Sequence, residues 1–167
     1  SNLMALVGTD GAETLVGGNK NDIIHAGDGD DVLEGGKGHD ALFGGAGEDV
    51  LAGGAGNDSL VGGAGIDTAD LSTSTSDVTL DLTAGTSAGT DTGSDTLSGI
   101  ENAVTGKGDD TLKGNSDNNI LDGGDGDDSL DGGKGNDKLI GGLGDDQISV
   151  SDGDDVVVAG GGSDTLV

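Results

Sequence analysis

A nine-residue repeat constrains this chain more than any other feature. Aligned on glycine, residues 8–70 and 105–167 each divide into seven copies of the pattern G-G-x-G-x-D-x-U-x, where U is a large aliphatic residue. One copy is too short to bury an apolar face alone, but stacked copies bury a continuous core. The sequence therefore predicts a solenoid of short strands and turns, interrupted once at residues 71–104.

The composition excludes several classes of protein. The chain has no cysteine, which excludes a disulfide framework and a thiolate metal site. It has no apolar run long enough to span a membrane, and its formal net charge of −27 opposes binding to nucleic acid. With 38 glycines and Phe43 as the single aromatic residue, the apolar core is thin. Such a negative chain needs cations to become compact.

Positions 7–9 of each copy are predicted to form a strand. Side chains alternate along a strand, so position 8 points inward while positions 7 and 9 face solvent. Position 8 is a large aliphatic residue in every copy except one, which has Ala69. Positions 1–6 then form the turn, and two copies make one 18-residue turn of the coil. The predicted fold class is all-β, a parallel β-roll or β-helix solenoid with two strands per turn.

Position 6 is predicted to carry the chemistry. It is aspartate in twelve of the fourteen copies, and the departures are Glu13 and Asn119. Copies n and n+2 stack about 4.8 Å apart, and aspartates at that spacing repel unless a cation lies between them. Carboxylate and carbonyl oxygens suit Ca²⁺ better than Mg²⁺, which gives up its waters reluctantly.

The repeats resemble the calcium-binding β-roll of RTX (repeats-in-toxin, hemolysin-type) proteins. The resemblance covers 126 of the 167 residues. It implies that each ion lies between two stacked turns. The implied ligands are the carbonyls of positions 2 and 4 and the aspartate of one copy, with the carbonyls of positions 1 and 3 and the aspartate of the copy two further on.

Three such sites are implied in residues 8–70. They would be formed by Gly27, Gly29 and Asp31 with Gly44, Ala46 and Asp49; by Gly36, Gly38 and Asp40 with Gly53, Ala55 and Asp58; and by Gly45, Gly47 and Asp49 with Gly62, Ala64 and Asp67. An eighth site would use Gly18 and Asp22 with Gly35, Lys37 and Asp40. This site is defective, because Lys20 replaces its position-4 glycine.

Four sites are implied in residues 105–167. They would be formed by Gly106, Gly108 and Asp110 with Gly123, Asp125 and Asp128; by Gly124, Gly126 and Asp128 with Gly141, Leu143 and Asp146; by Gly133, Gly135 and Asp137 with Val150, Asp152 and Asp155; and by Gly142, Gly144 and Asp146 with Ala159, Gly161 and Asp164. Two weaker sites depend on Glu13 or Asn119. The expected total is about seven to ten ions.

The organisation along the chain follows from the repeats. Residues 1–7 are interpreted as an N-terminal extension with a cloning remnant at its start, 8–70 as the first block, 71–104 as an insert and 105–167 as the second block. The alternation of Val78, Leu80 and Leu82 predicts a strand. Residues 90–98 keep Gly93, Asp95 and Leu97 at repeat positions 4, 6 and 8. We therefore expect an ordered insert, with Asp95 beside Asp67 or Asp110, rather than a flexible linker.

The resemblance implies a structural calcium-binding domain of a larger secreted bacterial protein. It would be exported by a type I system and fold when it meets extracellular calcium, as a monomeric part of the parent polypeptide. We expect no catalytic residues, because the repeat explains the carboxylates, and His25 and His39 fall at outward or turn positions. The alternative is an adhesin-type binding module that uses the solenoid surface. Outward positions 7 and 9 show no aromatic or apolar stripe in the sequence, which disfavours that alternative.

Overall fold

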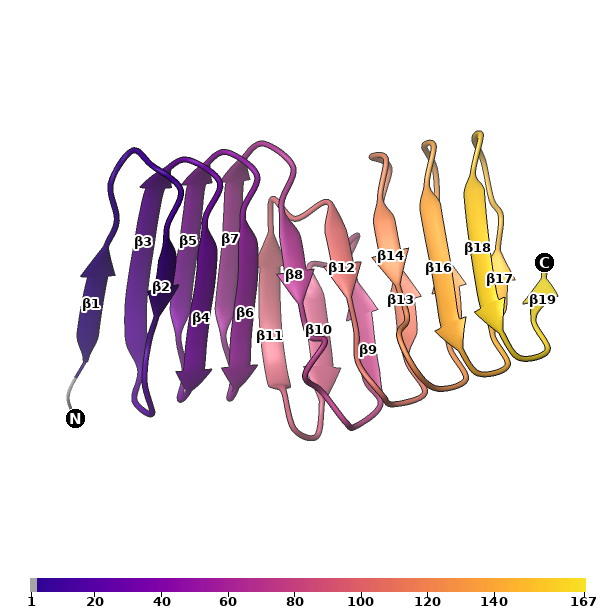
Figure 1. The fold of residues 1–167 in the computed structure, drawn as a ribbon, viewed down its shortest axis with the longest axis horizontal. Coiled ribbons are helices and arrows are strands. Elements are labelled where there is room, and N and C mark those ends of the chain that lie inside the picture. Colours follow the sequence, from indigo (N-terminus) through magenta and orange to yellow (C-terminus); the bar gives the residue numbers. More distant parts are fainter. Residues whose placement is uncertain (1–2) are drawn as a thin grey trace.

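The computed structural model describes residues 3–167 as an elongated, two-sheet β-solenoid (Figure 1). Among these residues every regular element is a strand, and no helix is long and apolar enough to span a membrane. The two sheets lie against each other along the rod, with the N-terminal strands at one end and the C-terminal strands at the other (Figure 1). The predicted all-β parallel solenoid is therefore confirmed.

The larger sheet has eleven strands. In spatial order they are β1 (Met4–Val7), β3 (Asp22–Asp28), β5 (Ala41–Ala46), β7 (Ser59–Ala64), β11 (Gly93–Ser98), β10 (Thr86–Gly89), β9 (Val78–Asp81), β13 (Thr111–Lys113), β15 (Ser129–Asp131), β17 (Gln147–Ser149) and β19 (Thr165–Leu166). The strand β1 lies in the segment interpreted as an extension, of which Ser1 and Asn2 fall outside the described residues.

The smaller sheet has eight strands. From the C-terminal end they are β18 (Val156–Gly161), β16 (Lys138–Leu143), β14 (Ile120–Asp122), β12 (Asn102–Val104), β8 (Thr68–Asp70), β6 (Val50–Ala55), β4 (Val32–Lys37) and β2 (Thr14–Val16). Within each block the register advances by 18 residues, as in Leu33 opposite Leu51 and Leu130 opposite Ile148. Two strands per 18-residue turn is the predicted arrangement.

The position-8 side chains form two aliphatic files that face each other between the sheets. Leu33, Leu42, Leu51, Leu121 and Leu139 are all fully buried. Each of these side chains stabilises the fold by roughly 1.5–3 kcal/mol relative to exposure. The insert contributes Leu71, Val78, Leu80, Leu82, Leu97 and Ile100 to the same core cluster. The core is therefore continuous along the rod.

Strand length departs from the sequence expectation. Positions 1–3 were predicted as turn only, yet β4 to β7 each run for six residues and include positions 1–3. Their position-2 glycines, such as Gly36 and Gly45, have positive φ and still pair with the glycine of the neighbouring turn. Glycine at position 2 does not by itself extend a strand: β13 and β17 stop after position 9, before Asn115 and Ser151, but β14 also stops there, before Gly124 with positive φ.

The insert contains strands β9 to β12 and doubles back on itself. The chain passes from β8 to β9, which pairs with β13 of the second block, and returns through the antiparallel strand β10 to β11, which pairs with β7 of the first block. It then crosses to β12, which lies between β8 and β14. Both sheets therefore run without a break from one block to the other.

The expectation of no stripe on the outer surface is wrong in the first block. The register places Val7, His25, Phe43 and Val61 side by side on the outer face of the larger sheet. The rings of His25 and Phe43 stack with centroids 4.4 Å apart. The repeats align these position-9 residues every 18 positions, so the stripe emerges only from the register.

Candidate metal centre

The position-6 aspartates form ladders of hydrogen bonds along both edges of the rod. In ten of the twelve position-6 aspartates, Oδ1 accepts the backbone N–H of the position-6 residue two copies earlier. Asp31 N donates to Asp49 Oδ1 at 2.9 Å, and Asp49 N donates to Asp67 Oδ1 at 2.8 Å. In the second block Asp110 N donates to Asp128 Oδ1 at 2.7 Å, and the ladder ends with Asp146 N on Asp164 Oδ1. The stacking of copies n and n+2 brings these carboxylates together, as the repeat requires.

The second carboxylate oxygen of most of these aspartates is buried and has no hydrogen-bond partner. The nine side chains with such an Oδ2 are Asp31, Asp40, Asp49, Asp58, Asp67, Asp110, Asp128, Asp137 and Asp146. A buried charged oxygen without a partner is strongly unfavourable. Seven predicted sites have no motif defect. In each of them, the aspartate of the first of the two copies is one of these nine.

Backbone carbonyls converge on the same spaces. A Cβ atom added to Gly44 would clash with both Asp49 Oδ2 and the carbonyl oxygen of Gly62. A Cβ atom added to Gly141 would likewise clash with both Asp146 Oδ2 and the carbonyl oxygen of Ala159. The absence of a position-1 side chain therefore leaves a small cradle lined by oxygen atoms. Such a donor set fits Ca²⁺, which takes six to eight oxygen ligands.

The remaining predicted carbonyls lie in the turn edges and are partly engaged. The position-3 carbonyls of Ala46, Ala55, Ala64, Leu143 and Gly161 accept the N–H of the position-4 glycine two copies earlier, at distances of 2.7–3.0 Å. The position-2 carbonyls of Gly18, Gly106 and Gly124 accept the N–H of Lys37, Asp125 and Leu143. A carbonyl oxygen has two lone pairs, so one of these hydrogen bonds leaves room for a second interaction.

The other predicted glycines hold the turns in shape. Positions 2 and 4 have positive φ at Gly27, Gly29, Gly36, Gly38, Gly45, Gly47, Gly124, Gly126, Gly133, Gly135, Gly142 and Gly144. At position 1, Gly35, Gly53 and Gly123 lie against the Oδ2 atom of their own copy's aspartate, Asp40, Asp58 and Asp128. Gly108 lies so close to the Ser76 carbonyl that an added Cβ atom would clash with it. The backbones of Asp152 and Lys134 form an isolated parallel β-bridge. Val150 donates its N–H to the Val167 carbonyl, and Asp155 Oδ1 accepts from Asp137 N.

Burial raises the pKa of most of these carboxyls. The pKa of Asp58 rises to about 6 and that of Asp128 to about 7 because burial disfavours the charged form and the neighbouring ladder carboxylates repel it. Donation from backbone N–H groups opposes the rise without cancelling it. The pKa values of Asp49, Asp67 and Asp146 are raised for the same reasons. A cation in the turns would reverse this penalty.

Copies with motif defects satisfy their own polar groups. In the copy with Lys20, Gly18 N donates to Asp22 Oδ2 at 2.7 Å. In the copy with Asn119, the amide oxygen accepts the N–H of Asn115 at 2.9 Å. Glu13 Oε1 accepts the N–H of Thr9. The three copies singled out from the sequence as defective therefore lack the unpartnered oxygen that nine of the other eleven copies share.

A second ladder, which the sequence analysis missed, runs outside the first. The position-5 side chains Asp109 and Asp127 accept the N–H of Asp127 and Asp145, each at 2.8–2.9 Å. His39 takes part on the other block, where its Nδ1 accepts the N–H of Asn57 at 2.9 Å. Position 5 is Asp or Asn in many copies, which is the signal that could have indicated this role.

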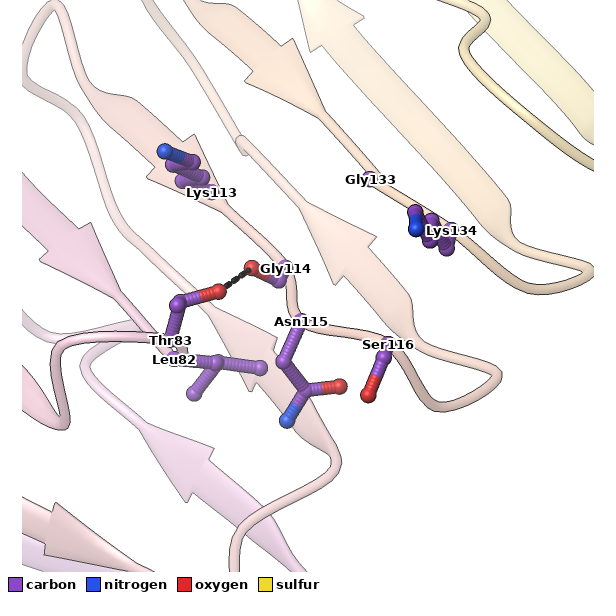
Figure 2. A pocket seen from close by; sticks show the side chains of 8 residues that line it. All are labelled: Leu82, Thr83, Lys113, Gly114, Asn115, Ser116, Gly133 and Lys134. Atoms are coloured by element: carbon purple, nitrogen blue, oxygen red, sulfur yellow. Dashed lines mark hydrogen bonds between the residues drawn. The ribbon is translucent and has the colours of Figure 1, made fainter.

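Residues 3–167 contain no group of three His, Asp or Glu side chains placed to hold a metal by themselves. Backbone carbonyls must therefore supply part of any coordination shell. A hollow of about 550 Å³ lies where the insert meets the second block and is bordered by Leu82, Thr83, Asn115 and the two lysines Lys113 and Lys134 (Figure 2). The titratable side chains that border it are the two lysines, so it offers no acid–base pair.

The profile of the family described as "RTX calcium-binding nonapeptide repeat (4 copies)" matches residues 7–42, 38–69, 95–130, 104–139 and 131–166. These matches cover more than half of the chain. The chain belongs to this family. RTX repeats bind calcium and form structural, non-catalytic domains typical of secreted proteins. A search of curated proteins gave no match.

Among solved structures, the RTX chain is similar to the extracellular lipase LipA from Serratia marcescens. The two share 21% sequence identity with a TM-score of 0.30, and the similarity covers 97% of this chain and 33% of the lipase. The chain thus spans about a third of that protein. The family match, and not this similarity, carries the assignment.

The position of Asp95 corrects one prediction. It was expected beside Asp67 or Asp110, but Asp58 N donates to Asp95 Oδ1 at 2.9 Å. The reason is the doubling back of the insert, which returns β11 to the exposed edge of β7. Glu101, which the sequence analysis did not single out, occupies the place next to Asp67 instead.

Proposed function

We propose that this chain is a calcium-dependent structural segment of a larger bacterial protein exported by a type I system. The observation that carries the proposal is the set of nine buried carboxylate oxygens without a partner. Without cations these oxygens and the net charge of −27 oppose folding. Calcium would then supply part of the folding free energy, so the chain would stay unfolded in a calcium-poor cytosol and fold outside the cell.

In the proposed scheme the seven regular sites are filled as the family resemblance implies. Asp49, for example, would contribute to two ions, one shared with Asp31 and one with Asp67. Seven ions add a charge of +14 to the net charge of −27, which leaves −13. The ions would act as structural counter-charge, and each site would have the affinity of an extracellular module, with Kd at the weak end about 10⁻⁴–10⁻³ M.

Circular dichroism with and without Ca²⁺ tests this proposal. We expect a largely disordered chain in excess chelator and a cooperative rise of β structure on adding calcium. Magnesium at the same concentration should produce much less of it. A β spectrum that excess chelator leaves unchanged would overturn the proposal.

An adhesin-type role is the second candidate, and the stripe of Val7, His25, Phe43 and Val61 favours it. Val7 is 76% exposed, and the stacked rings of His25 and Phe43 are exposed and partly exposed on the same face. A glycan and protein binding screen with the calcium-loaded chain tests this role. Binding that is lost in Phe43→Ser but kept in Glu34→Gln would support it, and no binding in the screen would remove it.

A further inference from the structure

Two of the nine unpartnered carboxylates have no predicted partner copy on the side of the insert. Asp58 and Asp67 belong to the last two copies of the first block, and the next copies in sequence are replaced by the insert. Asp58 faces Asp95, whose own Oδ2 accepts the hydroxyl of Ser87 at 3.1 Å. Asp67 has the more demanding environment, because it is completely buried.

The second oxygen of Asp67 points into a space shared with a backbone carbonyl. Asp67 Oδ1 accepts the N–H of Asp49 at 2.8 Å, whereas Oδ2 has no partner. A Cβ atom added to Gly62 would clash with both Asp67 Oδ2 and the carbonyl oxygen of Gly99. This cradle has the same form as the one between Asp49 Oδ2 and Gly62, although Gly99 lies outside the nonapeptide pattern.

Glu101 completes the same side of the space. Strand β12 pairs with β8 so that Asn102 lies opposite Thr68, which puts Glu101 level with Asp67. Asp67 N donates to Glu101 Oε2 at 2.9 Å, the bond that an aspartate Oδ1 accepts in each regular step. The glutamate therefore replaces a position-6 aspartate, and it brings a second acidic group next to the unpartnered oxygen of Asp67.

We propose that Asp67, Glu101 and the carbonyl oxygen of Gly99 form a further Ca²⁺ site at the joint between the first block and the insert. The inference rests on the proposed function and extends it to a turn that the repeat pattern does not include. Gly63 and Gly65, at positions 2 and 4 of the copy with Asp67, supply the remaining carbonyls by the scheme used in the regular turns. The ion ties the insert to the first block.

The site ends the part of the ion ladder that belongs to the first block on this edge. On the far side of Glu101, the side-chain amide of Asn119 donates to the Glu101 carbonyl oxygen at 2.6 Å and to Asn115 Oδ1 at 3.1 Å. An amide N–H thus occupies the place where a cation would otherwise join the two turns. The joint therefore holds one ion, between Asp67 and Glu101. Between Glu101 and Asn119, a hydrogen bond links the turns in place of an ion.

Counting bound calcium in Glu101→Gln tests the site. Glutamine keeps an oxygen that accepts the Asp67 N–H but loses the charge, so the variant should fold at saturating calcium and bind one ion fewer than the wild type in equilibrium dialysis. Glu34→Gln is the matched control, because Glu34 is exposed on an outer strand face, and it should bind the wild-type number. An unchanged count and midpoint in Glu101→Gln would overturn the inference.

A crystal of the wild-type chain grown with Ca²⁺ gives a test that needs no variant. Anomalous density about 2.3–2.6 Å from Asp67 Oδ2 and the Gly99 carbonyl oxygen supports the site. Density in the regular turns with none at this joint overturns the inference and leaves the proposed function standing. A wild-type chain that binds no calcium would instead contradict the proposed function itself.

Discussion

The two blocks of the solenoid share a repeat but differ in regularity. In the first block β4 to β7 are all six residues long, whereas β13, β14, β15 and β17 of the second block have three residues each. The second block has Asn115 and Ser151 at position 2, where five of the seven copies of the first block have glycine with positive φ. Every six-residue strand of the two blocks includes such a glycine, although β14 and β15 are short despite the glycines Gly124 and Gly133 that follow them.

The largest effect is expected from calcium removal, and the two blocks should unfold at different calcium concentrations. The copies with Glu13 and Lys20 lie at the N-terminal end of the rod, whereas the copy with Asn119 lies inside it. Because the second block also has shorter strand pairing, we expect it to lose amide protection at a higher free calcium concentration than the first. Hydrogen exchange of residues 44–70 and 123–149 across a calcium titration measures this order. Loss of protection in both blocks at one midpoint would mean that the rod folds as a single cooperative unit.

The next largest effect is expected from Leu97→Asp. Leu97 lies opposite Leu60 in the core where the insert joins the first block. A buried charge there should destabilise the rod by roughly 3 kcal/mol. Because both sheets continue through the insert, protection in residues 44–70 and 105–131 should fall together.

The matched control for Leu97→Asp is Ser98→Asp, which places the same charge on the same strand facing solvent. It should change protection little in either block. If Leu97→Asp leaves both blocks as protected as in the wild type, the insert is a tether between two independent rolls.

A smaller effect is expected from substituting single position-6 residues. The shift of the calcium midpoint should depend on where the residue lies along the edge of the rod. Asp49→Ala removes a carboxylate that would serve two ions and also the acceptor of the Asp31 N–H. Its calcium midpoint should rise by about tenfold or more. Glu13→Ala should change the midpoint by less than about twofold, because Thr9 already engages Glu13 at the end of the rod. Equal midpoints in a circular dichroism titration would contradict ions that bridge neighbouring turns.

The smallest effect is expected from pH in the absence of calcium. Folding raises the pKa of Asp58 to about 6 and of Asp128 to about 7, from an ordinary value of 3.8, so the folded chain binds protons more tightly than the unfolded chain. The contribution of these two carboxyls to the stability of the calcium-free rod is therefore greatest below pH 3.8 and falls as the pH rises towards 7. In chelator, circular dichroism should show a gain of β structure on acidification from pH 7 to about 4.

With calcium present the pH dependence should have the opposite sign. Protons compete with calcium for the same oxygens, so the calcium midpoint should rise as the pH falls below about 7. Calcium titrations at several pH values measure this change. A midpoint independent of pH between 5 and 7 would mean that the buried aspartates do not bind the ion.

The sequence by itself determined the regular part of the molecule. The nine-residue period specifies an 18-residue turn, the position-8 leucines specify the core, and the position-6 aspartates specify the ladder, because each of these features depends only on stacking of identical units. It also identified the copies with Lys20 and Asn119 as defective, and these are the copies whose carboxyl or amide groups are satisfied internally. The alternation of Val78, Leu80 and Leu82 correctly predicted the strand β9.

Only the tertiary structure decided how the repeat is interrupted and continued. No local pattern indicates that β9 to β11 double back, so Asp95 was assigned to the wrong neighbour and Glu101 to none. Their partners are set by which strand edges remain unpaired at the end of the first block, namely those of β7 and β8. The stripe of Val7, His25, Phe43 and Val61 arises in the same way, since residues 18 positions apart become neighbours only when the turns stack.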